Sequence, residues 1–88
     1  MDPTPRLAAA LRALGISPML YGDPLLSRDQ RTHFRDQVAL ELRRGRGELP
    51  GLSYPAIARE IGDRSHVTAM NRVARAEAAG YSPAALPR

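Results

Sequence analysis

The chain has 88 residues, enough for one small domain, and its 13 basic residues outnumber 9 acidic ones to give a net charge of +4 at pH 7. Every basic residue is an arginine and there is no cysteine, which excludes disulfides, thiol nucleophiles and thiolate metal sites. No apolar run approaches the roughly 20 residues that a membrane-spanning helix needs, so we expect no membrane partner.

The first predicted helix covers residues 5–14. Thr4 is suited to cap it, Pro5 to occupy its first turn and Gly15 to end it. Its apolar residues follow the spacing of one buried helical face, namely Leu7, Ala10, Leu11 and Leu14. A single helical turn is expected in SPMLYG, followed by a polar linker that includes residues 27–31 and so carries Arg28 and Arg31.

A second long helix is predicted over residues 32–44, with Phe34, Val38, Ala39 and Leu42 as its apolar stripe. Residues 43–51, RRGRGELPG, are predicted as a loop because glycine and proline interrupt helices. A shorter helix over residues 54–61, capped by Ser53, precedes a turn at 62–65. The last helix is expected over residues 66–79, ending at Gly80, with 80–88 as a frayed tail. No segment alternates with period 2, so the expected fold is all-α: a small helical bundle in one domain, residues 1–88, with its core at about 5–79.

The last predicted helix has two different faces. Its expected core side consists of Met70, Val73 and Ala76, with Ala69 alongside. Its second face consists of Thr68, Asn71, Arg72 and Arg75. Hydroxyl, amide and guanidinium groups contact phosphates and base edges, so this face suits DNA, although a solvated face on an ordinary helix would look similar. Residues 64–67 lie at the N-terminal end, where free N–H groups and the helix dipole attract phosphate.

A short helix, a turn containing Gly62 and a longer helix follow the helix-turn-helix plan. The segment LSYPAIAREIGDRSHVTAMNRVARA also resembles the DNA-binding domain of the bacterial chromosomal replication initiator, DnaA. The matching positions in it are Ser53, Pro55, Ile57, Gly62, Arg64, His66, Thr68 and Arg75. Upstream, Leu26-Ser27-Arg28 and Gln37-Val38-Ala39 match the family's L-S-basic loop and the helix after it, so the resemblance spans about residues 5–79.

The resemblance implies a role for each matching position. Those that would enter the major groove are Arg64, Ser65, His66 and Val67. Those that would hold phosphates or lie beside the bases are Thr68, Asn71 and Arg75, and Arg72 on the same face joins the predicted DNA-binding set. Tyr54 and Pro55 would begin a helix whose N-terminus abuts the DNA backbone. Arg28 or Arg31 would reach the minor groove.

Several positions depart from the family pattern. Ser65 replaces an aspartate that can accept from cytosine, and Val67 replaces a threonine. Asp63 replaces a glycine, Asp36 lies where the family tends to have arginine, and the loop at 43–51 is longer. We therefore expect DNA binding without the family's target sequence. There is no phosphate-binding G-x-x-x-x-G-K-[ST] motif, so ATPase activity is not expected.

Other chemistry has little support in the sequence. His33 and His66 are the only histidines, and neither lies in a cluster with the ligand spacing of a zinc site. Ser65-His66 lacks an orienting acid, so we expect no catalysis, metal, cofactor or small-molecule substrate. The carboxylates Asp36, Glu41, Glu60 and Asp63 are interpreted as solvated helix charges. The loop arginines Arg43, Arg44 and Arg46 either grip phosphates or remain solvated.

Arginine-only basicity favours nucleic acid, because guanidinium groups bind phosphate and guanine bidentately. Codon usage in a GC-rich genome would enrich arginine as well.

The N-terminus lacks the apolar stretch of a secretory signal, because Arg12 interrupts it. We therefore expect the protein in the cytoplasm or the nucleoid. The favoured function is a stand-alone duplex-DNA-binding protein that regulates transcription or replication initiation, with self-association or replication proteins as further partners. The alternative is a protein-interaction module of the same fold that binds the replication machinery rather than DNA.

Overall fold

The computed structural model describes residues 3–79, so the tail predicted at 80–88 and the helix stop at Gly80 lie outside the described residues. Its elements in chain order are α1 (Pro5–Leu14), α2 (Pro18–Tyr21), α3 (Arg28–Arg44), α4 (Tyr54–Ile61) and α5 (His66–Ala78). Within residues 3–79 no strand is present, and one isolated bridge joins Arg46 to Leu49. The prediction of a small all-α domain is confirmed.

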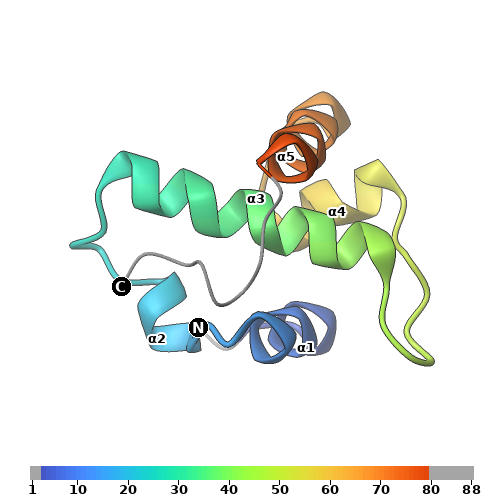
Figure 1. Ribbon diagram of the computed structural model, residues 1–88, viewed down its shortest axis with the longest axis horizontal. Helices are drawn as coiled ribbons and strands as arrows, with labels where there is room; N and C mark the ends of the chain where they lie inside the picture. Colours follow the sequence, from blue (N-terminus) through green and yellow to red (C-terminus); the bar gives the residue numbers. More distant parts are fainter. Residues whose placement is uncertain (1–2, 80–88) are drawn as a thin grey trace.

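The long helix α3 runs through the middle of the molecule (Figure 1). On one side of it lie α1 and α2, and on the other lie α4 and α5. Because α3 contacts α1, α4 and α5, it is the element against which the other long helices pack. The position of each surface therefore depends on which side of α3 its helix occupies.

The helices α1, α4 and α5 begin at the predicted residues, and a side chain caps the start of each one. The Thr4 hydroxyl accepts from the Leu7 N–H at 3.2 Å, and the Ser53 hydroxyl accepts from the Ala56 N–H at 3.4 Å. Ser65 caps α5 in the same way. Each cap satisfies a backbone donor that has no partner within its own helix.

The predicted start of α3 at Thr32 is wrong, because the helix begins at Arg28. Ser27 and Gln30 form a capping box: the Ser27 hydroxyl accepts from the Gln30 N–H at 3.1 Å, and the Gln30 side-chain oxygen accepts from the Ser27 N–H at 3.0 Å. Arg28 and Arg31 therefore lie on the first turns of a helix rather than in a linker. At the other end, α3 continues through Arg44, and the connecting loop begins at residue 45.

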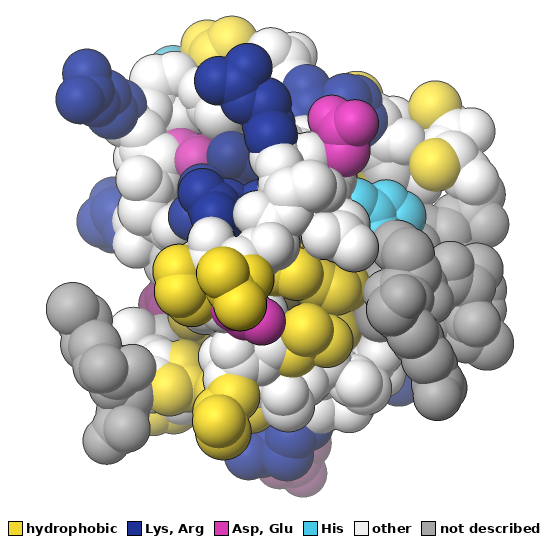
Figure 2. Space-filling model, turned by 90° about the vertical axis from the view of Figure 1, so that its left-hand side faces the viewer, with side chains coloured by type: hydrophobic (Ala, Val, Ile, Leu, Met, Phe, Trp, Pro, Cys, Tyr) yellow, Lys and Arg dark blue, Asp and Glu magenta, His cyan; other side chains and the backbone are white. Residues whose placement is uncertain are grey.

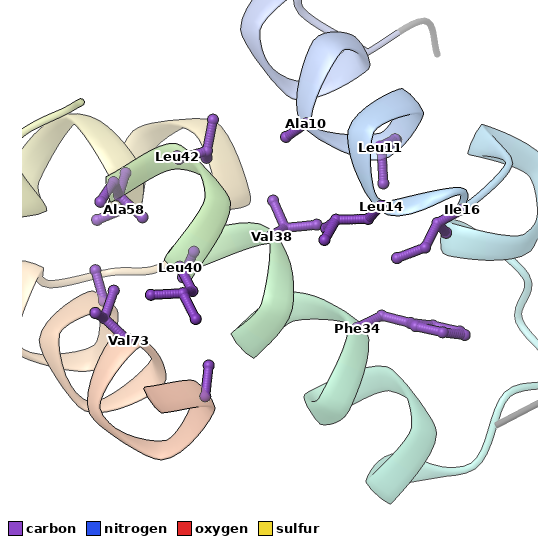
Figure 3. Packing of buried hydrophobic residues seen from close by; sticks show 14 residues of the cluster. Ala10, Leu11, Leu14, Ile16, Phe34, Val38, Leu40, Leu42, Ala58 and Val73 are labelled. Carbon is purple, nitrogen blue, oxygen red and sulfur yellow. The ribbon is translucent and has the colours of Figure 1, made fainter. Parts of the chain in front are cut away.

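The hydrophobic core is built on two sides of α3 (Figure 3). Phe34 and Val38 point toward the end of α1 and the residues after it, where Leu14 and Ile16 are buried. Leu40 points toward Val73 of α5. The predicted stripe of α3 covered the first side and omitted Leu40, which is 4% exposed. A central helix buries more than one face, so a single amphipathic stripe underestimates its buried residues.

The core side of α5 differs from the prediction at one position. Ala69, Val73 and Ala76 are 0–2% exposed, but Met70 is 43% exposed. Ala69, Val73 and Ala76 are spaced by four and then three residues, so their side chains lie on one narrow face of the helix. Met70 follows Ala69 directly and is rotated about 100° around the helix axis, away from that face. Because two of the three buried apolar residues are alanines, α5 can approach the neighbouring helices closely.

We expect the Ser27→Ala variant to lose about 1 kcal/mol of unfolding free energy, because the Gln30 N–H loses the hydroxyl that caps it while the backbone arm of the capping box remains. Urea denaturation measures this loss. Ser17→Ala is the control, since Ser17 caps only the single turn of α2, and its loss should be smaller. Equal stability of Ser27→Ala and the parent chain would contradict a helix that starts at Arg28.

Candidate nucleic-acid interface

The C-terminal part of the described chain forms a helix, a short turn and a second helix, here called the α4–α5 unit (Tyr54–Ala78). Gly62 ends α4 in the left-handed conformation at φ 91°, which favours glycine. Both the Gly62 and Asp63 N–H groups donate to the Ala58 carbonyl at 2.8 Å. The turn at 62–65 is therefore held to the end of α4, and it directs the chain into α5.

The N-terminal end of α5 is an exposed surface. Arg64, Ser65, His66 and Val67 are all exposed, and Val67 retains 51% of its accessible surface. The Ser65 hydroxyl accepts from the N–H groups of Val67 at 3.2 Å and Thr68 at 3.4 Å. Arg64 makes no ion pair among residues 3–79. This end of α5 thus combines a free guanidinium with the positive end of a helix dipole.

The other predicted contacts of the α4–α5 unit lie at the surface to different degrees. Asn71 is exposed and Thr68 is half-buried on α5. Pro55 is exposed in the first turn of α4, whereas the Tyr54 ring is half-buried. All four side chains therefore keep some accessible surface, with Asn71 and Pro55 the more open.

Arg72 is the main correction to the predicted interface, because it is only 8% exposed. Its guanidinium binds Asp63 bidentately, at 2.9 Å from Nε to Oδ2 and 3.0 Å from Nη2 to Oδ1. Its Nη1 also donates to Asp36 of α3 at 3.2 Å. Arg72 shares the buried side of α5 with Ala69, Val73 and Ala76, so it ties α5 to the turn and to α3 instead of facing solvent.

Arg75 is partly engaged in the same network. Its Nε and Nη2 each donate to the Asp36 carboxylate at 2.9 Å, although 52% of its side-chain surface is accessible. Hydrogen bonding to Asp63 raises the pKa of Arg72, and hydrogen bonding to Asp36 raises the pKa of Arg75. Both groups therefore remain cations. We name these four residues, Asp36, Asp63, Arg72 and Arg75, the α5 ion-pair network.

The interpretation of four carboxylates as solvated charges is wrong. Asp36 is 6% exposed and Asp63 belongs to the α5 ion-pair network. Glu41 pairs with Arg46 at 2.6 Å, and Glu60 accepts from the Thr4 hydroxyl. Long-range contacts of this kind depend on how the helices pack, and no local pattern in the sequence specifies them.

The arginines around the 45–53 loop have different environments. The Arg43 guanidinium lies over the Tyr54 ring, 4.3 Å from its centroid, and donates to the Leu52 carbonyl at 3.1 Å. Arg46 pairs with Glu41, whereas Arg44 is exposed and makes no ion pair among the described residues. Arg43 and Arg46 therefore support the loop. This leaves Arg44 as the loop-side cation open to an anion.

Arg28 and Arg31 lie at the start of α3, and Arg28 is exposed. Arg31 donates from Nη2 to the Leu26 carbonyl at 3.4 Å. Arg28 precedes Asp36 by eight residues, which corresponds to about 12 Å along the helix axis. A ligand that touches both Arg28 and the Arg75 guanidinium paired with Asp36 would therefore have to extend along α3.

No protein-family model matches this chain, and no curated protein or solved structure is significantly similar to it. Among residues 3–79, no helix combines the length and the apolar character that crossing a membrane would require. The same residues contain no group of three or more histidines and carboxylates placed to hold a metal ion.

We expect Asp36→Asn to lose about 2 kcal/mol of unfolding free energy, because Arg72 loses one of its two carboxylate partners and Arg75 loses its carboxylate partner. Chemical denaturation followed by circular dichroism measures the loss. The matched control is Glu41→Gln, since its partner Arg46 is 64% exposed and water already screens that pair. If the two variants lost equal stability, the α5 ion-pair network would not be what positions α5.

Proposed function

We propose that this chain binds duplex DNA by inserting the N-terminal end of α5 into a major groove. The supporting observation is the exposed run at residues 64–67, which begins a helix whose other side is buried. A helix-turn-helix protein uses this end of its second helix to contact base edges. The resemblance of this segment to the replication initiator's DNA-binding domain supports the same reading.

The α5 ion-pair network supports the proposal by fixing the helix that would read the DNA. Arg72 joins α5 to Asp63 in the turn and to Asp36 on α3. A recognition helix held rigidly loses less conformational freedom when it binds. Arg72 thus acts as a positioning residue, while DNA contact is left to the exposed end of the helix.

The side chains at this end suggest what would be read. Val67 offers methyl groups, which suit contact with the methyl of thymine. Arg64 can bind guanine or phosphate bidentately. Ser65 uses its oxygen lone pairs within the helix cap, but its hydroxyl proton remains available to a base acceptor or a phosphate. The target sequence should therefore differ from that of proteins with an aspartate at this position.

The network also lowers the number of cations available to DNA. With Arg72 buried and Arg75 held by Asp36, the free cations of the predicted set are Arg64, Arg28 and Arg31. Three phosphate contacts give a slope of about −3 for log K against log salt. Weak nonspecific binding fits a regulator of transcription or replication initiation that depends on base contacts.

A second candidate function is a protein-interaction module of the same fold. Two observations favour it: the carboxylates of the α5 ion-pair network neutralise both of its arginines, and Met19 and Leu25 are 88% and 89% exposed. Under this function the apolar side chains would contact a component of the replication machinery, and salt would have little effect on binding.

The first experiment is selection from a randomised duplex pool of about 20 base pairs at about 150 mM salt, where nonspecific electrostatic binding is weakened. We expect an enriched motif, and we expect Arg64→Ala to weaken binding to it by about tenfold or more through the loss of a bidentate contact. Fluorescence anisotropy measures the affinities across a salt series.

Arg12→Ala is the matched control for Arg64→Ala. Arg12 is an exposed arginine on α1, which lies across α3 from α5 (Figure 1), and its loss changes the net charge by the same amount. If the pool yields no motif and binding to bulk DNA does not depend on salt, the DNA-binding proposal fails. The protein-interaction function would then be favoured.

A further inference from the structure

A hollow of about 270 Å³ lies between the end of α2, the segment that follows it and the first turns of α3. Its lining residues are Tyr21, Gly22, Asp23, Pro24, Arg31 and Arg35. Figure 2 shows the side of the molecule that carries α2 and the start of α3, where arginine side chains gather next to hydrophobic ones. None of the residues that line the hollow belongs to α5.

Two cations line this hollow without a balancing ion pair. Arg31 and Arg35 are four residues apart on α3, so their side chains share one face of the helix. Neither forms an ion pair within residues 3–79. Two like charges at this spacing repel each other, and an anion bound between them would relieve that repulsion.

Asp23 is the only carboxylate among the lining residues, and its Oδ1 accepts from the Leu25 N–H at 2.9 Å. It lies outside ion-pair distance of both arginines. The lining therefore keeps a net positive charge. Asp23 also shapes the segment between α2 and α3 through its hydrogen bond to the backbone.

The Tyr21 hydroxyl is a second sign of an unfilled interaction. Its oxygen is buried, and no hydrogen-bond partner of acceptable geometry is present among the described residues. Burial raises the pKa of Tyr21, while the positive charge of the neighbouring Arg35 guanidinium and hydrogen bonding to it partly oppose that change. Buried hydroxyls in native proteins nearly always have a hydrogen-bond partner, either in the protein or in an ordered water, so a polar ligand in this hollow could serve the same hydroxyl.

We propose that this hollow binds a phosphate group through the guanidiniums of Arg31 and Arg35 and the hydroxyl of Tyr21. The planar guanidinium matches two phosphate oxygens at once, and a tyrosine hydroxyl donates to a third. The phosphate belongs either to a free phosphorylated compound or to the backbone of duplex DNA. Only the second source rests on the proposed function. In both cases Arg31 serves phosphate binding instead of the minor-groove contact expected from the sequence.

The test titrates isotope-labelled protein with inorganic phosphate at constant ionic strength, with chloride as the balancing anion. NMR follows the Nε–H signals of the arginines and the amides of residues 21–24. We expect saturable shifts at Arg31 and Arg35. Arg35→Gln should raise the phosphate Kd about tenfold through the loss of charge-assisted hydrogen bonds, and Arg12→Gln, the matched control, should leave it unchanged.

Tyr21→Phe tests the hydroxyl without removing the ring. Because the variant keeps the ring and the hydroxyl makes no hydrogen bond of standard geometry among residues 3–79, it should fold like the parent chain while binding phosphate more weakly. An unchanged phosphate Kd would overturn the role of Tyr21. Shifts that do not saturate, or that are as large at Arg12 as at Arg35, would indicate an adventitious ion only.

Binding to duplex DNA identifies the source of the phosphate. If it is the DNA backbone, Arg35→Gln should make the slope of log K against log salt shallower by about 0.9, and Arg12→Gln should not. A saturable phosphate titration with an unchanged DNA slope assigns the hollow to a free phosphorylated compound. If both measurements are negative, the site is refuted, whereas the DNA-binding proposal is judged separately by Arg64→Ala.

Discussion

The buried guanidinium of Arg72 determines how the functional half of this fold is arranged. A charge in the interior must be paired, and Arg72 satisfies this need with one carboxylate from the turn and another from α3. Since Asp63 and Asp36 lie far apart in the sequence, both can reach Arg72 only when α5 is docked on α3. The ion pairs thus restrict α5 to one position, which nonpolar contacts between its small alanines would define less sharply.

This arrangement divides α5 into two parts with different tasks. The later turns carry Arg72 and Arg75, whose charges are balanced within the protein. The first turn and the residue before the cap carry Arg64 and His66, which are exposed. The basic residues of a helix are often counted together as one DNA-binding face. Here the count overstates the available charge, because Asp36 and Asp63 balance Arg72 and Arg75.

Features governed by near neighbours in the chain could be predicted from the sequence. Thr4, Ser53 and Ser65 cap helices at the expected positions, and Gly62 ends α4, because each acts on backbone groups within a few residues. The capping box at Ser27 and Gln30 is equally local, so the true start of α3 could have been found. The burial of Arg72 and the exposure of Met70 could not, since both depend on where α3 lies against α5.

The distribution of unpaired arginines is more informative than the net charge of +4. Where a carboxylate comes within reach, as at Arg72 or Arg46, the arginine supports the fold. Where none does, as at Arg64 and at Arg31 with Arg35, the charge remains available to an external anion. Arg64 immediately precedes the cap of α5, whereas Arg31 and Arg35 line the hollow beside α2. If DNA supplies the anion at both, its backbone must reach from the turn before α5 to the hollow beside α2, so the placement of both α2 and α5 relative to α3 would decide whether one duplex can contact both.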